Sequence, residues 1–291
     1  MGPAESGPSY ARAASQAAEL ASPGAPGLLA SGLPPWYDVR VGFPGATVEY
    51  IMRRGFVLYD GPSAINGARI VVIMTTQTSN QKTGPMPQVW YLVADKEPHT
   101  AHKDRDDVAI CGGCKHALED SCYVVLHRAP LSVYRSWIAG KYGTLEEGIR
   151  WLDYMRPRLV RVGAYGDPMA APHLLPLLGD KVESHGGRLL GYSHRWKHPT
   201  AATYRRWLMA SVDTPADGLR ARSKGWRTFR VRTEGEPLAW DEVLCAHEEN
   251  RTACNACGEC DGESTRPSIV ATVHGLRHIV RKFEAWRGGA A

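Results

Sequence analysis

Long apolar runs are absent from this sequence. No stretch of about 18 apolar residues occurs, so we predict no membrane-spanning helix. The first residues also lack a positively charged region followed by an apolar core, which argues against a secretory signal. A large net charge is absent too, because 35 Lys and Arg nearly balance 30 Asp and Glu and the net charge is only +5. These shortages favour a cytoplasmic protein with no membrane association.

Cysteine is also scarce, with seven in 291 residues, and none of the seven stands alone. Three lie in the stretch AICGGCKHALEDSCYV and four in CAHEENRTACNACGEC. They are Cys111, Cys114 and Cys122, and Cys245, Cys254, Cys257 and Cys260. Disulfides are one use of such residues, but Cys-x-x-Cys steps in a chain without a secretory signal favour two metal sites. Four thiolates close a site, whereas three leave one metal position open for a ligand.

The spacing within each group bears on the identity of the metal. Two glycines separate Cys111 from Cys114, so no side chain crowds the centre that both thiolates would reach. The Cys-x2-Cys-x2-Cys run of the second group is typical of iron–sulfur loops, because zinc sites more often separate two Cys-x-x-Cys pairs by a longer segment. For the first group a structural zinc site is an alternative, with His116 or His127 as the fourth ligand.

The composition is that of a globular protein, with 43% apolar and 22% charged residues. Residues 1–34 are rich in Ala, Gly, Pro and Ser and are predicted to be a disordered lead-in. We assign residues 35–240 to an α/β domain that begins with a β-rich segment. Residues 241–291 would form a cysteine-rich metal-binding segment with a closing strand and helix.

The first half of the chain predicts a pair of strands and then a loop. Residues 68–76 and 88–95 are rich in Val, Ile, Tyr and Trp, and the turn residues NQKTGP lie between them. These two strands should be adjacent. A polar loop over 96–110 follows and leads to the first cysteines, and we interpret its His99 and His102 as loop residues.

Helices and strands alternate in the rest of the chain. Helices are predicted at 130–142 and 144–155, the second starting with a capping box of Thr144 and Glu147. Further strands are predicted near 157–165, 187–196, 207–214, 226–233 and 268–275, and further helices near 171–186, 201–206, 215–225 and 277–286. This alternation predicts parallel strands in an α/β fold, either a whole or a partial (β/α) barrel.

Polar residues stand where the predicted parallel strands end. They are Tyr165, Gly166, Asp167, Ser193, His194, Ser211 and Asp213. Active sites of barrels lie at the C-terminal ends of the strands, so these residues should face one surface together with the first cysteine group. We expect Asp167, held between a glycine and a proline, to present its carboxylate to a ligand there.

The order of these features resembles the radical S-adenosylmethionine superfamily over roughly residues 60–275. In that family a three-cysteine loop follows the first barrel strand, and a Gly-Gly-Glu-Pro type motif ends the second strand, where this chain has Gly166-Asp167-Pro168. A later Ser-Leu-Asp-Gly type strand is matched in order by the segment 211–214. The family's usual loop is Cys-x3-Cys-x2-Cys, whereas this one is Cys-x2-Cys-x7-Cys. The stretches KTGPMPQVWYL, GAYGDPMAAP and SVDTP…GWRTFRV are similar to uncharacterised proteins of phages and mobile elements.

The resemblance implies an enzyme that uses radical chemistry. Cys111, Cys114 and Cys122 would hold a [4Fe–4S] cluster with one iron open to S-adenosylmethionine. Residues implied at the cofactor are Gly166, Asp167, Ser193 and Ser211, and Asp213 would serve catalysis. Cys245, Cys254, Cys257 and Cys260 would hold an auxiliary cluster. A small-molecule or nucleic-acid-derived substrate and an external electron donor are the implied partners.

A second function, from a different class, stays open. Basic and aromatic residues are interleaved in 194–207 and 274–287, which would suit a zinc-stabilised protein that binds nucleic acid without catalysis. The same segments could instead be solvated helix faces. Asp213 also has two interpretations, because it could act as a base or substrate contact, or cap the helix that begins at Pro215.

Overall fold

The computed structural model describes residues 53–262 and 265–288. The predicted lead-in at 1–34 lies outside this range. Contacts group Thr47–Ala291 into one unit, so the cysteine-rich segment 241–291 belongs with the strands that precede it. Each helix in the described range is too short or too polar to cross a lipid bilayer.

The described strands form two five-stranded sheets, ordered β1-β2-β3-β4-β5 and β6-β7-β8-β10-β9. Their bounds are β1 Gly55–Pro62, β2 Arg69–Thr75, β3 Gln88–Val93, β4 Leu159–Tyr165, β5 Arg188–Leu190, β6 Tyr192–Ser193, β7 Met209–Val212, β8 Thr228–Arg232, β9 Glu242–Leu244 and β10 Ser268–Thr272. The pairs β1–β2 and β2–β3 are antiparallel, and all the other pairs are parallel. The predicted adjacent strands and the predicted parallel α/β arrangement are therefore confirmed, while β1 and β9 are additional strands.

One short segment takes part in both sheets. β5 pairs with β4 and β6 pairs with β7, and only Gly191 separates β5 from β6. The Gly191 amide donates to the carbonyl of Cys260, and its carbonyl accepts from the amide of Met209. A side chain at this position would meet Val162 Cγ2 at 2.5 Å. Glycine is needed here because the chain crosses from one sheet to the other in close contact with β4.

The described strands do not close into a barrel, so the whole-barrel alternative is not supported. The free edge of β1 is covered by a loop residue instead of another strand. The Val57 amide donates to the Gly143 carbonyl at 2.8 Å, and the Gly143 amide donates to the Gly55 carbonyl at 3.0 Å. These bonds occupy edge groups of β1 that a closing strand would need.

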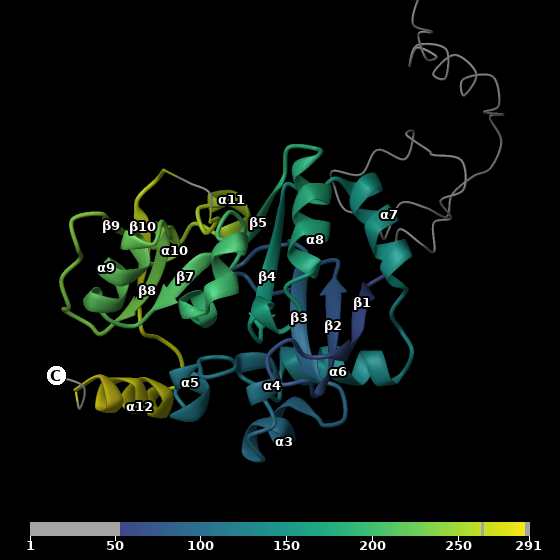
Figure 1. The fold of residues 1–291 in the computed structure, drawn as a ribbon, viewed down its shortest axis with the longest axis horizontal. Helices are drawn as coiled ribbons and strands as arrows, with labels where there is room; N and C mark the ends of the chain where they lie inside the picture. Colours follow the sequence, from purple (N-terminus) through teal and green to yellow (C-terminus); the bar gives the residue numbers. More distant parts are fainter. Residues whose placement is uncertain (1–52, 263–264, 289–291) are drawn as a thin grey trace, which may run out of the picture. The chain divides into compact units, whose positions relative to one another are not determined.

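Helices connect most of the parallel strands. Their bounds are α3 Pro98–Lys103, α4 Val108–Cys111, α5 Lys115–Leu118, α6 Ala129–Ile138, α7 Leu145–Met155, α8 Leu174–Glu183, α9 Pro215–Ser223, α10 Ala246–Asn250, α11 Cys254–Cys257 and α12 Arg277–Gly288. Figure 1 shows α7 and α8 beside the first sheet and α9 beside the second. The capping box is confirmed, because the Glu147 amide donates to Thr144 Oγ1 and the Thr144 amide donates to the Glu147 carboxylate.

Two helix predictions need correction. The segment predicted as a polar loop, 96–110, contains α3 and most of α4, so His99 and His102 lie on a helix. Pro98 begins α3, as proline often does, because its missing amide hydrogen has no partner in a first turn. The helix predicted at 201–206 is a 3₁₀ helix, Pro199–Tyr204, which is also started by proline.

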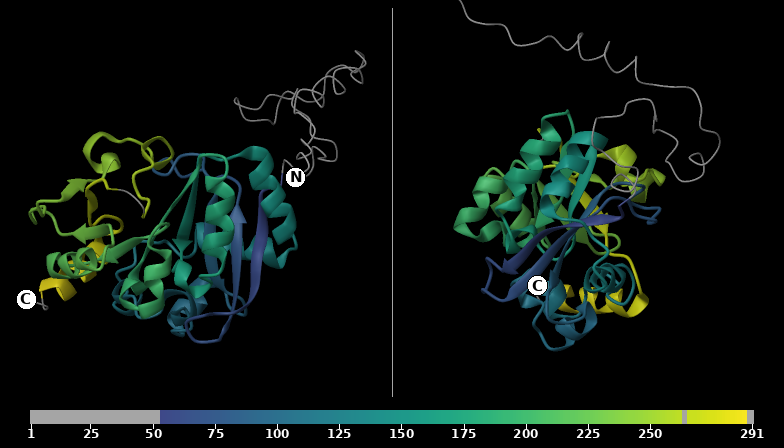
Figure 2. Two further views of the ribbon diagram at one scale, coloured as in Figure 1. Left: turned by 45° about the horizontal axis from the view of Figure 1, so that its top comes forward. Right: turned by 90° about the vertical axis from the view of Figure 1, so that its right-hand side faces the viewer.

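The helix α12 returns to the region of the first cysteines. Figures 1 and 2 show it beside the short helices that follow β3. Trp286 Nε1 donates to Ser121 Oγ at 3.1 Å, and Lys282 Nζ donates to Asp120 at 3.3 Å. Phe283 is fully buried in this contact. Segments far apart in sequence therefore build one wall around the cysteine loop.

A buried ion pair fixes β9, the strand that leads directly into Cys245. Arg230 on β8 is fully buried. Its Nε and Nη2 donate to the two carboxylate oxygens of Glu242 on β9 at 2.8 and 2.7 Å. Its Nη1 donates to Glu236 at 2.6 Å. The guanidinium of Arg230 thus donates charge-assisted hydrogen bonds to two carboxylates inside the protein.

We expect Arg230→Ala to lower the free energy of unfolding by about 3–5 kcal/mol, because it leaves the Glu242 carboxylate buried without its partner. Denaturant titration of wild type and variant at neutral pH measures the loss. Arg69→Ala is the matched control, since it removes an exposed pair with Asp60. Equal losses in the two variants would contradict the importance of the buried pair.

Candidate functional site

Polar residues at three neighbouring strand ends are joined by hydrogen bonds. Ser193 Oγ donates to Asp167 Oδ1 at 2.7 Å, and the His194 amide donates to Asp167 Oδ2 at 2.9 Å. Ser211 Oγ lies 3.0 Å from His194 Nε2. The ends of β4, β6 and β7 therefore converge, as parallel strands predict.

The Asp167 carboxylate is already used by the chain itself. Besides its two bonds from Ser193 and His194, it accepts the amide of Met169 at 2.9 Å and so caps the 3₁₀ helix Pro168–Ala170. Its own amide donates to the Ile110 carbonyl at 2.6 Å, which ties the end of β4 to α4. Burial raises the pKa of Asp167, although these donors favour its ionised form. The carboxylate thus holds its own turn and the end of β6, the amide ties that turn to the cysteine loop, and the expected contact of Asp167 with a ligand stays a prediction.

Gly166 is explained by its neighbours and not by an open ligand site. Its φ of +77° lies in the left-handed region. A Cβ there would meet Tyr91 Cβ at 2.6 Å and the Tyr91 carbonyl at 3.0 Å, so the turn packs closely on β3. The predicted contact between Gly166 and a cofactor stays a prediction.

The three cysteines of the first group lie on the loop between β3 and α6. Cys111 ends α4, Cys114 precedes α5, and Cys122 follows it. Burial raises the pKa of Cys111 well above its usual value, and the charges of Cys114 and Cys122 add to the rise. Burial likewise raises the pKa of Cys122 to about 12. Buried thiols with a raised pKa are poor nucleophiles but suit a metal, which takes the place of their protons.

A histidine that we had placed only at a strand end lies beside this loop. Cys114 lies close enough to His194 to affect its ionisation. Burial alone would lower the pKa of His194, but Cys114 and nearby carboxylates raise it to about 10. The histidines proposed as zinc ligands are placed differently. His116 bonds Asp213 and Ser121, and His127 lines a separate pocket beyond the loop.

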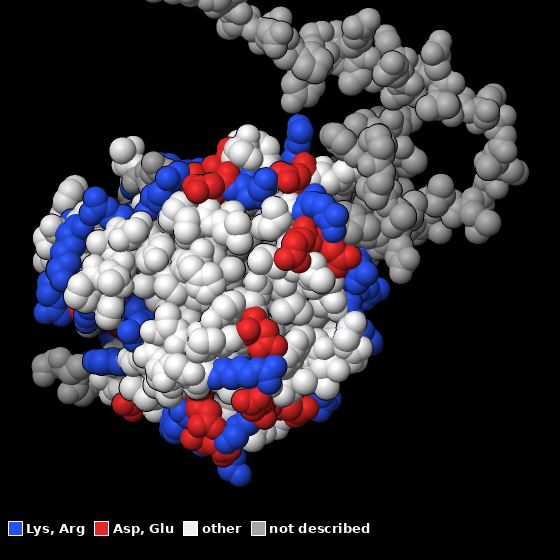
Figure 3. Space-filling model, turned by 45° about the vertical axis from the view of Figure 1, so that its right-hand side comes forward, with Lys and Arg blue, Asp and Glu red and all other residues white. Residues whose placement is uncertain are grey.

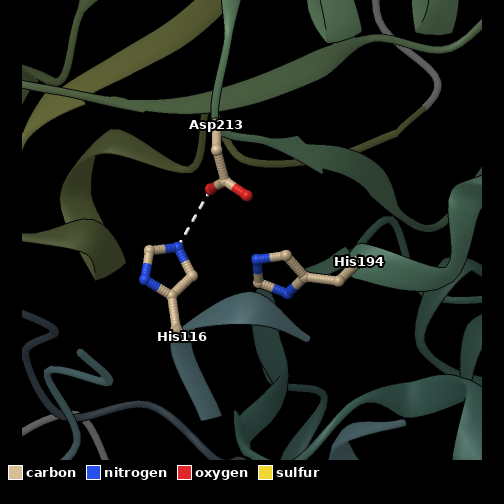
Figure 4. A group of neighbouring side chains, drawn as sticks. All are labelled: His116, His194 and Asp213. Atoms are coloured by element: carbon tan, nitrogen blue, oxygen red, sulfur yellow. Dashed lines mark hydrogen bonds and ion pairs between the residues drawn. The ribbon is translucent and has the colours of Figure 1, made fainter. Parts of the chain in front are cut away.

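His116, His194 and Asp213 form the tightest group of possible metal ligands among the described residues. Their ligand atoms all lie within 4.8 Å of one another. In Figure 4 the imidazole of His116, from α5, points to Asp213 at the end of β7, and His194 enters from the side. His116 Nε2 lies 2.9 Å from Asp213 Oδ1, and the His116 ring stacks on Phe283 of α12. The group is thus held by contacts from three parts of the chain.

Asp213 is not the cap of α9. Thr214 has that role, since its Oγ1 accepts the Asp217 amide at 3.0 Å. The Asp213 carboxylate faces His116 instead. Burial opposes the ionisation of Asp213, but the hydrogen bond from His116 and the nearby His194 hold its pKa below the usual value. The capping interpretation of Asp213 is therefore wrong.

In the second cysteine group, Cys245 directly follows the C-terminal end of β9, whereas the other cysteines lie on or just after α11. Cys254 and Cys260 pack against Leu159 and Leu190, so they lie near the start of β4 and beside β5. Burial raises the pKa of Cys254, and raises that of Cys260 to about 12. Figure 1 shows α11 at one end of the strands and α4 and α5 at the other.

One cavity, with a volume of about 200 Å³, reaches both cysteine groups. Cysteines on its lining are Cys114, Cys122, Cys245, Cys254, Cys257 and Cys260. Ser211 and His194 also line it, so the strand-end network forms part of the same wall. We had inferred two separate metal sites, and the structure adds a shared pocket between them.

The spacing of the thiols allows a test of the metal. A tetrahedral zinc ion with Zn–S bonds of about 2.3 Å holds its sulfurs roughly 3.8 Å apart. Among the described residues, which include all seven cysteines, no three thiols lie within 4.8 Å of one another. As placed, the thiols are therefore farther apart than in a three-thiolate zinc site, and whether either group binds iron–sulfur clusters or zinc stays a prediction.

Comparisons with protein-family models, with curated proteins and with solved structures found no match. The function must therefore be argued from the residues of the site.

We expect Asp167→Asn to destabilise the protein by about 1–3 kcal/mol, because an amide cannot accept all three hydrogen bonds and would set its NH2 group against a buried donor. Thermal and denaturant unfolding would measure the effect. Asp95→Asn, at an exposed site just after β3, is the control and should change stability by less than about 0.5 kcal/mol. An unchanged midpoint for Asp167→Asn would mean that the hydrogen bonds of the carboxylate to its own turn and to the end of β6 do not stabilise the fold.

Proposed function

We propose that this protein is a cytoplasmic iron–sulfur enzyme of the radical S-adenosylmethionine type, built on a partial (β/α) barrel. The observation that carries the proposal is the position of the first cysteine group. Three partly buried thiols follow β3 near the ends of parallel strands, and those of Cys114 and Cys122 line the cavity. Three protein thiolates leave one position of a four-iron cluster for another ligand.

Cys111, Cys114 and Cys122 would hold a [4Fe–4S] cluster, and the four C-terminal cysteines would hold a second one. When bound, the first cluster supplies the electron that cleaves a carbon–sulfur bond of S-adenosylmethionine and so begins radical chemistry on the substrate. An external electron donor would have to reduce it. The second cluster would be structural or would relay electrons.

The protein residues around the first cluster would orient it and exclude water. Asp167 ties the end of β4 to the loop, and Ser193 orients Asp167. Ser211 lines the cavity directly. Asp213 hydrogen-bonds His116, which also lines the cavity, and so orients that ring. Phe283 of α12 stacks on His116 and so shields one side of the cysteine loop from solvent, as radical chemistry requires.

The alternative, a zinc-stabilised protein that binds nucleic acid, has less support. Basic side chains of 194–207 and 274–287 are paired with acids, as in Lys197–Asp217, Lys282–Asp120 and Arg287–Glu236. The large aromatics of the first segment, Trp196 and Trp207, are buried and cannot stack on bases. On the face drawn in Figure 3, acidic and basic side chains are mixed along much of the rim. Nucleic acid stays a possible source of the substrate and not the favoured partner.

Metal content decides between the two functions. Protein isolated without oxygen should be brown and contain iron and inorganic sulfide in amounts that match one or two four-iron clusters. Adding S-adenosylmethionine to the reduced protein should change its electron paramagnetic resonance spectrum, because the ligand binds the open iron. Colourless protein with stoichiometric zinc would refute the proposal.

We expect the two cysteine groups to respond differently to substitution. Cys114→Ala should remove about half of the iron and the spectral response to S-adenosylmethionine, while most of the protein still folds. Cys257→Ala should reduce the yield of folded protein more, because its group joins α11 to the start of β4 and metal ligation contributes to folding free energy. Iron analysis and circular dichroism measure both effects.

His127→Ala is the control for these cysteine variants. His127 lies close to Cys122 in sequence but lines a separate pocket, so iron content and spectra should stay unchanged. Equal losses of iron and fold in Cys114→Ala and Cys257→Ala would contradict the division between a reactive and a supporting cluster.

A further inference from the structure

Arg161, on β4, lies in the cavity between the two cysteine groups and has no carboxylate partner among the described residues. Its Nη2 donates to Tyr123 Oη at 3.1 Å and to Tyr192 Oη at 3.4 Å. All three side chains line the cavity. Two neutral phenols do not balance a guanidinium charge, so Arg161 lacks an anionic hydrogen-bond partner, although Lys82 and Glu259 also line the cavity.

Among the described residues, the two buried arginines are compensated, whereas the partly buried Arg161 is not. Arg230 is paired with Glu242 and Glu236, and Arg227 with Asp261. A guanidinium withdrawn from water is costly unless a carboxylate or another anion replaces its hydration. The open position next to Arg161 therefore suits an anion from outside the chain.

The walls around Arg161 suit a planar organic body. The Tyr192 ring stacks on Phe229, with 4.4 Å between ring centroids and 12° between the ring planes. Tyr123 lies beside His274, with their centroids 5.9 Å apart. Aromatic walls bind apolar or planar groups, and a guanidinium with two phenol hydroxyls can bind the oxygens of a carboxylate or a phosphate.

We propose that Arg161, Tyr123 and Tyr192 form a binding site for an organic oxyanion, a carboxylate or phosphate carried by a planar body. Tyr123 follows Cys122 directly, and Arg161 lies near Cys254, so a bound anion would sit between the two cysteine groups. That this anion is the substrate rests on the proposed function, whereas its binding does not.

The test uses the full chain isolated without oxygen and four probes in calorimetric titrations. The probes are benzoate, phenyl phosphate, inorganic phosphate and the neutral benzyl alcohol. Wild type should bind benzoate or phenyl phosphate more tightly than inorganic phosphate and benzyl alcohol. The tighter of the two aromatic anions assigns carboxylate or phosphate chemistry to the site.

Arg161→Gln should weaken binding of the preferred anion about 10- to 100-fold, because it removes a charge-assisted hydrogen bond. Arg161→Lys should weaken it less, and Tyr192→Phe should weaken it severalfold. Arg69→Gln, at an exposed site on β2, is the control and should bind as wild type does. If Arg161→Gln does not fold, the Arg161→Lys and Tyr192→Phe variants decide the matter.

Several outcomes would overturn the inference. One is the absence of binding of any anion by wild type, and another is equal affinity in wild type and the site variants. A third is a change in the reduction potential of the C-terminal cluster in Arg161→Gln without any anion binding, since Arg161 would then only neutralise nearby thiolates. Arg161-dependent binding in protein that contains no iron would support the site but refute the proposed radical chemistry.

Discussion

The hydrogen bonds of one buried aspartate, made by its carboxylate and its backbone amide, hold the candidate site together. Asp167 receives donors from the end of β6 and from its own turn, and its amide reaches back to the loop that carries Cys111. The strands alone would bring their C-terminal ends to one edge, but they would not fix the position of a loop between β3 and α6. Because Asp167 bonds the end of β6 through its carboxylate and the loop through its backbone amide, the cysteine loop and His194 are tied to the same residue.

Much of the fold could be predicted because it depends on local patterns. β-branched runs, turn residues and the capping box at Thr144 report on neighbours a few residues away. Barrel closure could not be predicted, since it depends on which group covers the edge of β1, and that group is Gly143. The short helices within 96–110 were missed because four- to six-residue helices carry too few turns for a periodic signal.

The candidate site shows the same division. The grouping of the cysteines and the polar residues at strand ends are visible in the sequence, and the structure brings those strand ends together. The contact between His194 and Cys114, and the position of Arg161 between two phenols, join residues far apart in the chain. No local pattern specifies such partners. Asp167 lies in a motif that predicted a ligand contact, and in the structure its carboxylate accepts three hydrogen bonds from the chain itself.

The cover provided by α12 has a consequence for how the protein is made. Trp286 lies 165 residues after its partner Ser121 in the chain. At translation rates of about 5–20 residues per second, the cysteine loop leaves the ribosome roughly ten to thirty seconds before that cover exists. If the loop carries a cluster, its thiols are open to an iron donor during this interval and become shielded afterwards. Loading in the cell would then be easiest on the nascent chain.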